Sequence, residues 1–129
     1  MGPWVCERTG GQYFPGESSA IGLERDGQLV AGVLFDHYNG KSVAMHVAGE
    51  GSNWMTRNFL VTCFRYPFVQ LGVHKIIGLV DSSNRLARRL DEHLGFTMEA
   101  VVKDAAPHGD LLIYSMTREQ CRFLSYEVA

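Results

Sequence analysis

The sequence predicts an α/β (α+β) fold with one mixed, mostly antiparallel sheet and helices packed against it. Three patterns support this prediction: three β-rich runs between residues 20 and 48, a long amphipathic segment at 53–71, and a strand, helix, strand unit at 75–102. Short turns that contain glycine separate the first three runs, so we expect them to form an antiparallel meander. The chain has 129 residues, and we predict a single domain over 1–129.

The first half of the chain supplies the meander. Residues 4–8 are predicted as an edge strand, and glycines and prolines make the following segment a loop. The dipeptides Asp26-Gly27 and Asn39-Gly40 tolerate the positive φ angles of tight turns. They separate three predicted strands, at residues 21–25, 29–38 and 42–48.

A long helix is predicted at residues 53–71. Its apolar residues recur on one broad face, and Ser52 or Asn53 is available to cap its first turn. Gly72 is placed to end it. Pro67 lies inside the span, where it removes one backbone amide and clashes with the carbonyl four residues earlier. We therefore expect a kink near Tyr66.

A second helix organises the rest of the chain. The unit around it consists of a buried strand, a short helix and an alternating strand, predicted at residues 75–80, 84–96 and 97–102. The apolar stripe of the helix is formed by Leu86, Leu90 and Leu94. Ser82 and Ser83 offer hydroxyl caps before it, and Gly95 supplies a left-handed stop after it.

The carboxy-terminal part is shorter and less regular. The elements predicted there are a loop, a strand and a short helix, at residues 103–110, 111–116 and 118–124. Pro107 and Gly109 indicate the loop. Thr117 and Gln120 have the spacing of a capping box, which predicts the start of the helix.

Composition limits the class of protein. The 12 basic and 14 acidic side chains give a net charge of −2, so nothing favours general nucleic-acid binding. No apolar run approaches membrane-spanning length, and no amino-terminal segment resembles a secretion signal. The three cysteines are odd in number and lack metal-binding spacing. We expect a cytoplasmic protein that binds neither a metal nor a membrane.

One segment matches a known family residue by residue. The pattern Asn-x-x-Ala-x-x-Leu followed by Gly-Phe is carried by Asn84, Ala87, Leu90 and Gly95-Phe96. It resembles the carboxy-terminal signature of the GNAT superfamily of acyl-CoA-dependent N-acetyltransferases. Glu99 extends the match toward the branch that acetylates ribosomal-protein amino termini, and toward short bacteriophage relatives.

The resemblance covers residues 21–124 in element order and implies both a fold and an activity. The implied reaction moves an acetyl group from acetyl-CoA to an amine acceptor, either a small molecule or a protein amino terminus. The amine attacks the thioester directly, without a metal and without a covalent enzyme intermediate.

The resemblance also implies a site for acetyl-CoA. In the family, a glycine-rich helix start faces the pyrophosphate, because the free amides and the dipole of a helix amino terminus favour anions. The matching segment here lacks those glycines, although Arg57 offers a guanidinium group. The candidate cofactor-binding residues are Val47, Asn53, Trp54, Thr56, Arg57, Asn84 and Arg88.

Several of these candidates also have a purely structural interpretation. Asn84 stands where the family's asparagine contacts the pantetheine arm, but asparagine is equally suited to capping a helix. Arg57 is interpreted either as a phosphate ligand or as a solvated helix residue. Arg88 belongs to an arginine cluster, Arg85, Arg88 and Arg89, that either meets the adenosine phosphate or covers a solvated helix face.

Two residues are candidates for catalysis. His46 lies mid-strand beside the proposed cofactor strand, and it is the candidate base because histidine as a residue type suits proton transfer near neutral pH. The family often uses a tyrosine at the eighth position of the Asn84 motif to protonate the departing thiolate, but this position holds Asp91. Tyr114 on a late strand is the second candidate. A structural histidine and a half-buried strand tyrosine are the alternatives.

Two other functions stay open. A GNAT-fold binding or assembly module without catalysis is compatible with the missing glycines and the missing tyrosine. A Rossmann-type nucleotide binder fits less well, because an antiparallel meander before the first long helix does not belong to a doubly wound sheet. The sequence does not name the acceptor, and an exposed edge strand would allow a homodimer.

Overall fold

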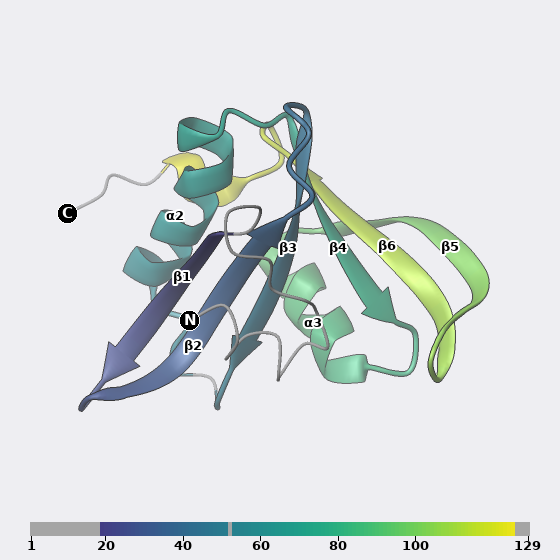
Figure 1. Ribbon diagram of the computed structural model, residues 1–129, viewed down its shortest axis with the longest axis horizontal. Coiled ribbons are helices and arrows are strands. Elements are labelled where there is room, and N and C mark those ends of the chain that lie inside the picture. The colour runs from purple at the N-terminus through teal and green to yellow at the C-terminus, as the bar shows by residue number, and fades with distance from the viewer. Residues whose placement is uncertain (1–18, 52, 126–129) are drawn as a thin grey trace.

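The computed structural model describes residues 19–51 and 53–125 as a twisted sheet with helices packed on it (Figure 1). In these residues the sheet has six strands in the order β1-β2-β3-β4-β6-β5, and only β3 and β4 pair in parallel. The predicted fold class is confirmed. The strand predicted at 4–8 lies outside the described residues.

The strands are β1 (Ser19–Arg25), β2 (Gln28–Asp36), β3 (Ser42–Gly49), β4 (Lys75–Asp81), β5 (Thr97–Ala106) and β6 (Gly109–Thr117). The helices are α2 (Arg57–Arg65), the π-helix η1 (Tyr66–Gln70), α3 (Arg85–Leu94) and the 3₁₀ helix η2 (Arg122–Ser125).

The meander formed by β1, β2 and β3 agrees with the prediction. Asp26 and Gly27 both have positive φ angles, 53° and 77°, as a tight hairpin turn between twisted strands requires. The second strand was predicted to reach residue 38, but β2 ends at Asp36. His37 has a φ of 56°, and this left-handed conformation turns the chain out of the sheet.

Helix α2 begins at Arg57, so the predicted start at residue 53 is wrong. Thr56 is the N-cap, and its Oγ1 accepts a hydrogen bond from the Phe59 amide at 3.3 Å. Trp54 stays outside the helix because its indole Nε1 donates to the Gly51 carbonyl at 2.8 Å. This bond holds the residues before the cap in a turn.

Pro67 changes the type of helix instead of ending it. The chain continues as the π-helix η1, in which the Leu71 amide donates to the Tyr66 carbonyl five residues earlier, at 2.9 Å. This wider pattern accommodates a residue without an amide hydrogen. The irregularity lies where the kink was predicted, and Gly72, with a φ of 71°, follows the helix as expected.

Helix α3 ends as predicted, but the residue that caps its start is not one of the predicted serines. Its N-cap is Asn84 and not a serine: the Asn84 Oδ1 accepts from the Ala87 amide at 3.1 Å. Ser83 instead donates its amide and hydroxyl to Asp81 in the turn before the helix. Gly95 ends the helix with a φ of 110°, as predicted. Leu86 is 79% exposed and does not join the core with Leu94.

The loop predicted at 103–110 is wrong, because β5 and β6 form a long hairpin in which β6 pairs with β4 on its other side (Figure 1). Asp104 has a φ of 54°, and the pairing register shifts near it, so the extra residues form a bulge. The Asp104 amide donates to Asp110 Oδ1 at 3.1 Å across the hairpin. The tip therefore needs only Pro107 and His108 between the strands.

The predicted capping box is present. The Thr117 amide donates to Gln120 Oε1 at 2.9 Å, and the Gln120 amide donates to Thr117 Oγ1 at 3.3 Å. The helix that follows is shorter than predicted, since only the 3₁₀ helix η2 forms. Arg122 in η2 donates to the carbonyls of His93 and Leu94 and so caps the end of α3.

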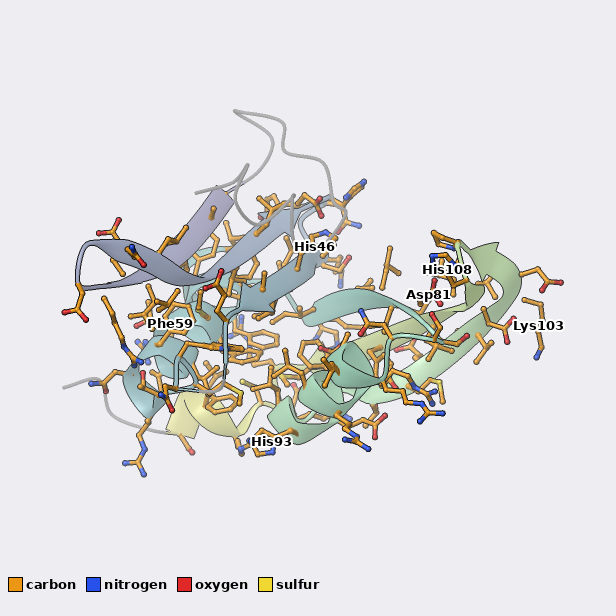
Figure 2. The ribbon with its side chains drawn as sticks, turned by 90° about the horizontal axis from the view of Figure 1, so that it is seen from below. His46, Phe59, Asp81, His93, Lys103 and His108 are labelled. Atoms are coloured by element: carbon orange, nitrogen blue, oxygen red, sulfur yellow. The ribbon has the colours of Figure 1, made fainter. Side chains whose placement is uncertain are left out.

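The helices α2, α3 and η2 lie on one face of the sheet (Figure 2), where they share a core with alternate strand residues. Phe64 of α2 is fully buried at its centre, stacked on Phe123 at 4.9 Å and tilted against Phe96 at 6.2 Å. These contacts fix α3 and the start of β5 relative to α2. No helix in the described residues is both long and apolar enough to cross a membrane.

Candidate active site

The two parallel strands at the centre of the sheet separate after a short contact. Strands β3 and β4 pair only from Ser42 to Ala44 and from Lys75 to Ile77. Beyond this point the rest of β3 and the rest of β4 diverge, and two connected pockets open between them in the described part of the chain. Their volumes are about 850 and 400 Å³. Four residues line both pockets: Val47, Asn84, Ala87 and Leu90.

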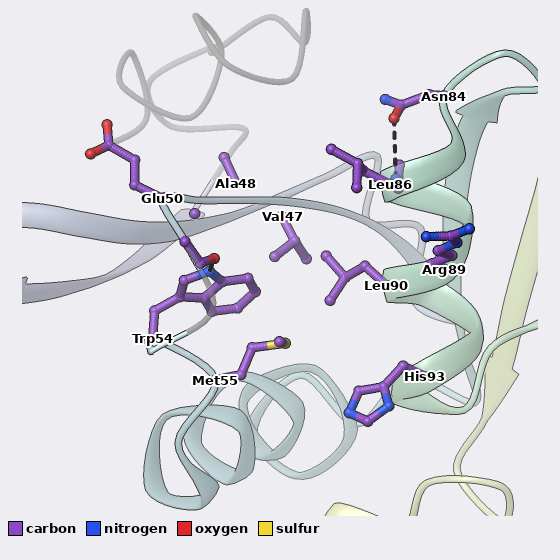
Figure 3. A pocket seen from close by; sticks show the side chains of 13 residues that line it. Val47, Ala48, Glu50, Trp54, Met55, Asn84, Leu86, Arg89, Leu90 and His93 are labelled. Carbon is purple, nitrogen blue, oxygen red and sulfur yellow. Dashed lines mark hydrogen bonds between the residues drawn. The ribbon is translucent and has the colours of Figure 1, made fainter.

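The larger pocket, here called the outer pocket, lies between β3, the turn before α2, and α3 (Figure 3). Its walls are mostly apolar, with Trp54 and Met55 on one side and Leu86 and Leu90 on the other. The exposed Leu86 thus stands at the edge of a pocket. An apolar cleft with a few polar groups on its rim is the usual form of a ligand site.

A glycine allows Trp54 to form one wall of the outer pocket. The indole is 4% exposed, and a Cβ atom on Gly49 would overlap two of its ring atoms, Cε2 and Nε1. The ring therefore packs directly on the β3 backbone. The Gly51 carbonyl fixes its orientation through the hydrogen bond to Nε1.

We expect Gly49→Ala to displace Trp54 and to destabilise the protein by about 1–3 kcal/mol, since the new methyl group overlaps the ring. Fluorescence of Trp54 in a Trp4→Phe background should shift to the red, and urea unfolding gives the loss of stability. In a Trp54→Leu background the same substitution should cost much less. An equal cost in both backgrounds would contradict the direct contact.

Asn84 stands where the two pockets meet. Its Oδ1 caps α3, while Figure 3 shows its side-chain nitrogen pointing away from the helix. The capping role, one of the two predicted interpretations, is present. It occupies the acceptor atom and leaves the amide hydrogens directed away from the helix, so the side chain can also donate to a ligand.

Only some of the other predicted cofactor residues line the outer pocket. Val47 and Trp54 line the outer pocket, whereas Asn53, Thr56 and Arg57 are exposed at the start of α2 and do not. Thr56 acts as the N-cap described above.

The arginine cluster points in different directions. Arg88 donates from Nη1 to the Ser82 carbonyl at 3.3 Å and does not line the outer pocket. Arg89 does, together with His93 one turn later. The basic side chains at this rim are therefore Arg89, a member of the arginine cluster, and His93, which the sequence analysis did not single out.

The smaller pocket, here called the inner pocket, passes between the faces of the sheet. His46 borders it from β3, on the face turned away from the helices, and Figure 2 shows His46 and His93 on opposite sides. Asp91 and Leu90 border it from α3. The tip of the β5–β6 hairpin closes one end, held there by the Asp81 carboxylate, which accepts from the His108 amide at 2.9 Å.

His46 has a buried carboxylate beside it. Its Nε2 lies 3.1 Å from Oδ1 of Asp36, a residue 6% exposed. A carboxylate accepts hydrogen bonds, so Nε2 carries the hydrogen and Nδ1 holds the lone pair of the neutral ring. The exposed His37 contacts the same oxygen at 3.0 Å, and this hydrogen bond raises the pKa of His37.

Asp91 is the other titratable side chain of note in the inner pocket. Burial, together with the neighbouring charge of Glu92, raises the pKa of its carboxyl to about 7. A Cβ atom on Gly78 would lie 3.2 Å from Asp91 Oδ2, so the carboxyl lies against the β4 backbone. The described part of the chain provides it with no hydrogen-bond donor.

Tyr114 lies outside both pockets. It is fully buried, its hydroxyl donates to Glu92 Oε2 at 2.7 Å, and burial raises its pKa. This geometry agrees with the structural alternative for Tyr114. Cys63 is also fully buried, with a pKa raised to about 12, so its thiol is not available as a nucleophile.

Among residues 19–51 and 53–125, no three His, Cys, Asp or Glu side chains are grouped closely enough to hold a metal ion. No protein-family model matches the chain, and no curated protein matches it in sequence. Solved structures do match. The spermidine N-acetyltransferase SpeG from Vibrio cholerae (F149A mutant) superimposes with a TM-score of 0.71 at 20% identity, over 86% of this chain and 70% of that one.

Two further structures agree. The N-acetyltransferase PseH from Campylobacter jejuni, solved with acetyl coenzyme A, gives a TM-score of 0.62 at 18% identity, over 80% of this chain and 70% of that one. A probable acetyltransferase gives 0.65 at 19% identity over 80% of this chain, which spans 62% of its length. The chain has the GNAT fold. Identities of this size establish the fold and leave the activity to be argued from the site.

The residues of the Asn84 motif lie beside the two pockets. The resemblance placed Asn84, Ala87 and Leu90 on one helix, and all three line both pockets. Glu99, which extended the motif, lies away from the pockets and accepts hydrogen bonds from Lys75 Nζ at 2.9 Å and Ser115 Oγ at 2.5 Å. Its role in this chain is to tie β5 to its neighbours.

Proposed function

We propose that this chain is an N-acetyltransferase that moves an acetyl group from acetyl-CoA to a primary amine by direct attack. One observation carries the proposal: the cleft between β3 and β4 passes between the faces of the sheet and has a titratable side chain on each side, His46 and Asp91. Such a cleft lets a long cofactor enter from the helix side and an amine from the other. The PseH structure, which has the same fold, contains acetyl coenzyme A.

The pantetheine arm would lie along the edge of β3 that faces the cleft. Strand β4 pairs with β3 only up to Ala44, so backbone groups between residues 45 and 49 face the cleft without a partner strand in the described part of the chain. An extended amide chain can pair with such an edge. Val47 provides an apolar contact, and Asn84 provides amide hydrogens.

The nucleotide end would lie toward the start of α2 and the rim of the outer pocket. The dipole at the start of α2 favours an anion there, next to Trp54, and Asn53, Thr56 and Arg57 lie at that start. On the opposite wall, Arg89 and His93 are available to a phosphate group. Arg88 would act only indirectly, through its contact with Ser82.

His46 would act as the general base. The reacting amine must be neutral when it attacks and must lose a proton afterwards. Nδ1 of His46 can take that proton, while Asp36 holds Nε2 and stabilises the imidazolium that forms. Cys63 and Cys121, the two cysteines of the described residues, are both buried, which fits transfer in one step without an acetylated cysteine at either position.

The test is release of the free CoA thiol from acetyl-CoA in the presence of primary amines. Spermidine is the first probe, because SpeG of the same fold is a spermidine N-acetyltransferase, and a short peptide with a free amino terminus is the second. Release that depends on either amine would support the proposal. Binding of acetyl-CoA without turnover would favour the alternative of a non-catalytic binding module.

We expect His46→Ala to lower kcat by between about 10²- and 10⁴-fold, the usual contribution of a general base. His74→Ala is the matched control, since His74 is exposed and lines neither pocket. Steady-state rates and acetyl-CoA affinity should be measured for both variants. If His46→Ala retains full activity, the base is another group or a water molecule.

A further inference from the structure

Asp91 lies on the helix side of the inner pocket. It belongs to α3, one turn after Ala87, and its carboxyl packs against Gly78 of β4. A side chain at Gly78 would fill this space, so the absence of a Cβ atom there admits the carboxyl to the gap between the strands. The carboxyl borders the pocket together with Asn84 and Leu90.

His46 and Asp91 reach the inner pocket from opposite faces of the sheet. On β3, Val43 and Met45 point into the core beneath the helices, so His46 points to the other face. Asp91 comes from α3, on the core side. The two groups therefore border the gap between β3 and β4 from its two ends.

We infer that Asp91 protonates the CoA thiolate as it leaves, at the position where related chains often carry a tyrosine. The inference rests on the proposed function. Asp91 is assigned to the sulfur because it lies on the same side as the cofactor. The outer pocket, which would hold the cofactor, opens on the helix side, so the sulfur leaves toward Asp91 and away from His46.

Every bond and proton in the proposed reaction is accounted for. The amine lone pair forms the new C–N bond, the C–S bond breaks, and its electron pair stays on sulfur. Sulfur takes the proton of the Asp91 carboxyl, and His46 Nδ1 takes a proton from the nitrogen. Solvent then moves one proton from the imidazolium to the Asp91 carboxylate before the next turnover.

The surroundings of Asp91 keep part of it protonated near neutral pH. Burial and the adjacent Glu92 raise its pKa to about 7. The other charged or titratable groups that border the inner pocket are His46 on β3 and Asp81 at the end of β4. The hairpin contributes only Ala105, Ala106, Pro107 and Leu111. A donor whose pKa is near the working pH is the most effective general acid.

The test measures the thiol of bound CoA, which requires no knowledge of the acceptor. CoA is bound to the wild type and its thiolate absorbance is followed against pH in the ultraviolet. A carboxylate beside the sulfur disfavours a second negative charge, so the wild-type complex should titrate at higher pH than the Asp91→Asn complex, by about one unit or more. Asp91→Glu should restore most of the shift.

The matched control is Asp104→Asn, which removes a carboxylate from an exposed position that tolerates the left-handed φ of asparagine. It should titrate like the wild type. Equal thiol pKa values in the wild type and Asp91→Asn would overturn the role of Asp91 and leave the proposed function intact. Absence of CoA binding to the folded wild type would overturn both.

Discussion

Asp91→Asn should make the protein more stable at pH 8 while its advantage disappears at low pH. The folded-state pKa of about 7 is above the ordinary value of 3.8 for an unfolded aspartate carboxyl. The folded protein therefore keeps a proton that the unfolded chain has lost, and wild-type stability falls as pH rises from about 4 to 7. Above pH 7 both states are ionised, and the wild type carries the full cost of a buried carboxylate.

The expected gain of Asp91→Asn at pH 8 is about 4 kcal/mol, because the pKa rises from 3.8 to about 7 and each pKa unit corresponds to about 1.4 kcal/mol. Asparagine has nearly the same shape and no charge. Urea unfolding of both proteins at several pH values measures the difference, with Asp104→Asn as the control. Parallel stability curves from pH 4 to 8 would show that Asp91 titrates normally. A gain in stability with a loss of thiol protonation is the compromise expected of a functional carboxyl.

Ala87→Trp should strongly weaken acetyl-CoA binding. Ala87 lines both pockets where they join, and an indole there would block the passage from the outer to the inner pocket. We expect affinity to fall at least about 100-fold, which corresponds to about 2.7 kcal/mol. The helix itself should lose only about 0.5 kcal/mol, because tryptophan is a weaker helix former than alanine.

Arg85→Trp is the control for this substitution, since it adds the same ring to the exposed start of α3, at a residue that lines neither pocket. Calorimetric titration measures both affinities, and thermal unfolding shows whether either variant is damaged. If Ala87→Trp binds acetyl-CoA as well as Arg85→Trp does, the cofactor does not pass through this cleft.

The parts of the fold that could be predicted are those decided by a few neighbouring residues. The turn at Asp26-Gly27, the stop at Gly95 and the capping box at Thr117 depend on local backbone preferences, and all three are present. The start of α2 could not be predicted this way. Asn53 and Thr56 are both good caps, and the choice between them is made by the hydrogen bond from Trp54 to Gly51.

The hairpin between β5 and β6 could not be predicted for a similar reason. Pro107 and Gly109 are loop residues by composition, and both lie at the tip. The bulge at Asp104 depends on its contact with Asp110 across the hairpin, so it appears only once the strands are paired. Leu86 is exposed because a cleft lies beside α3. The spacing of apolar residues along the helix gives no information about such a cleft.

For the candidate site, the sequence pointed to the elements that border the two pockets but not to the surroundings of the side chains there. The Asn84 motif located the helix that borders the cleft, and His46 was placed on the right strand. The pairing of His46 with Asp36 had a signal, since a hairpin around Asn39-Gly40 brings β2 and β3 into register and places these residues on one face. The raised pKa of Asp91 had no signal in the sequence, because it arises from burial against β4 and from the charge of Glu92.

Calorimetric titration of acetyl-CoA into the wild-type protein tests the central claim most directly. ATP is the comparison ligand, because it carries an adenine nucleotide and phosphates but no pantetheine arm. We predict binding of one acetyl-CoA per chain, at least about tenfold tighter than ATP, because the β3 edge and the cleft recognise the arm. No binding heat from a folded sample, or ATP binding as tightly as acetyl-CoA, would contradict a cofactor site between β3 and α3.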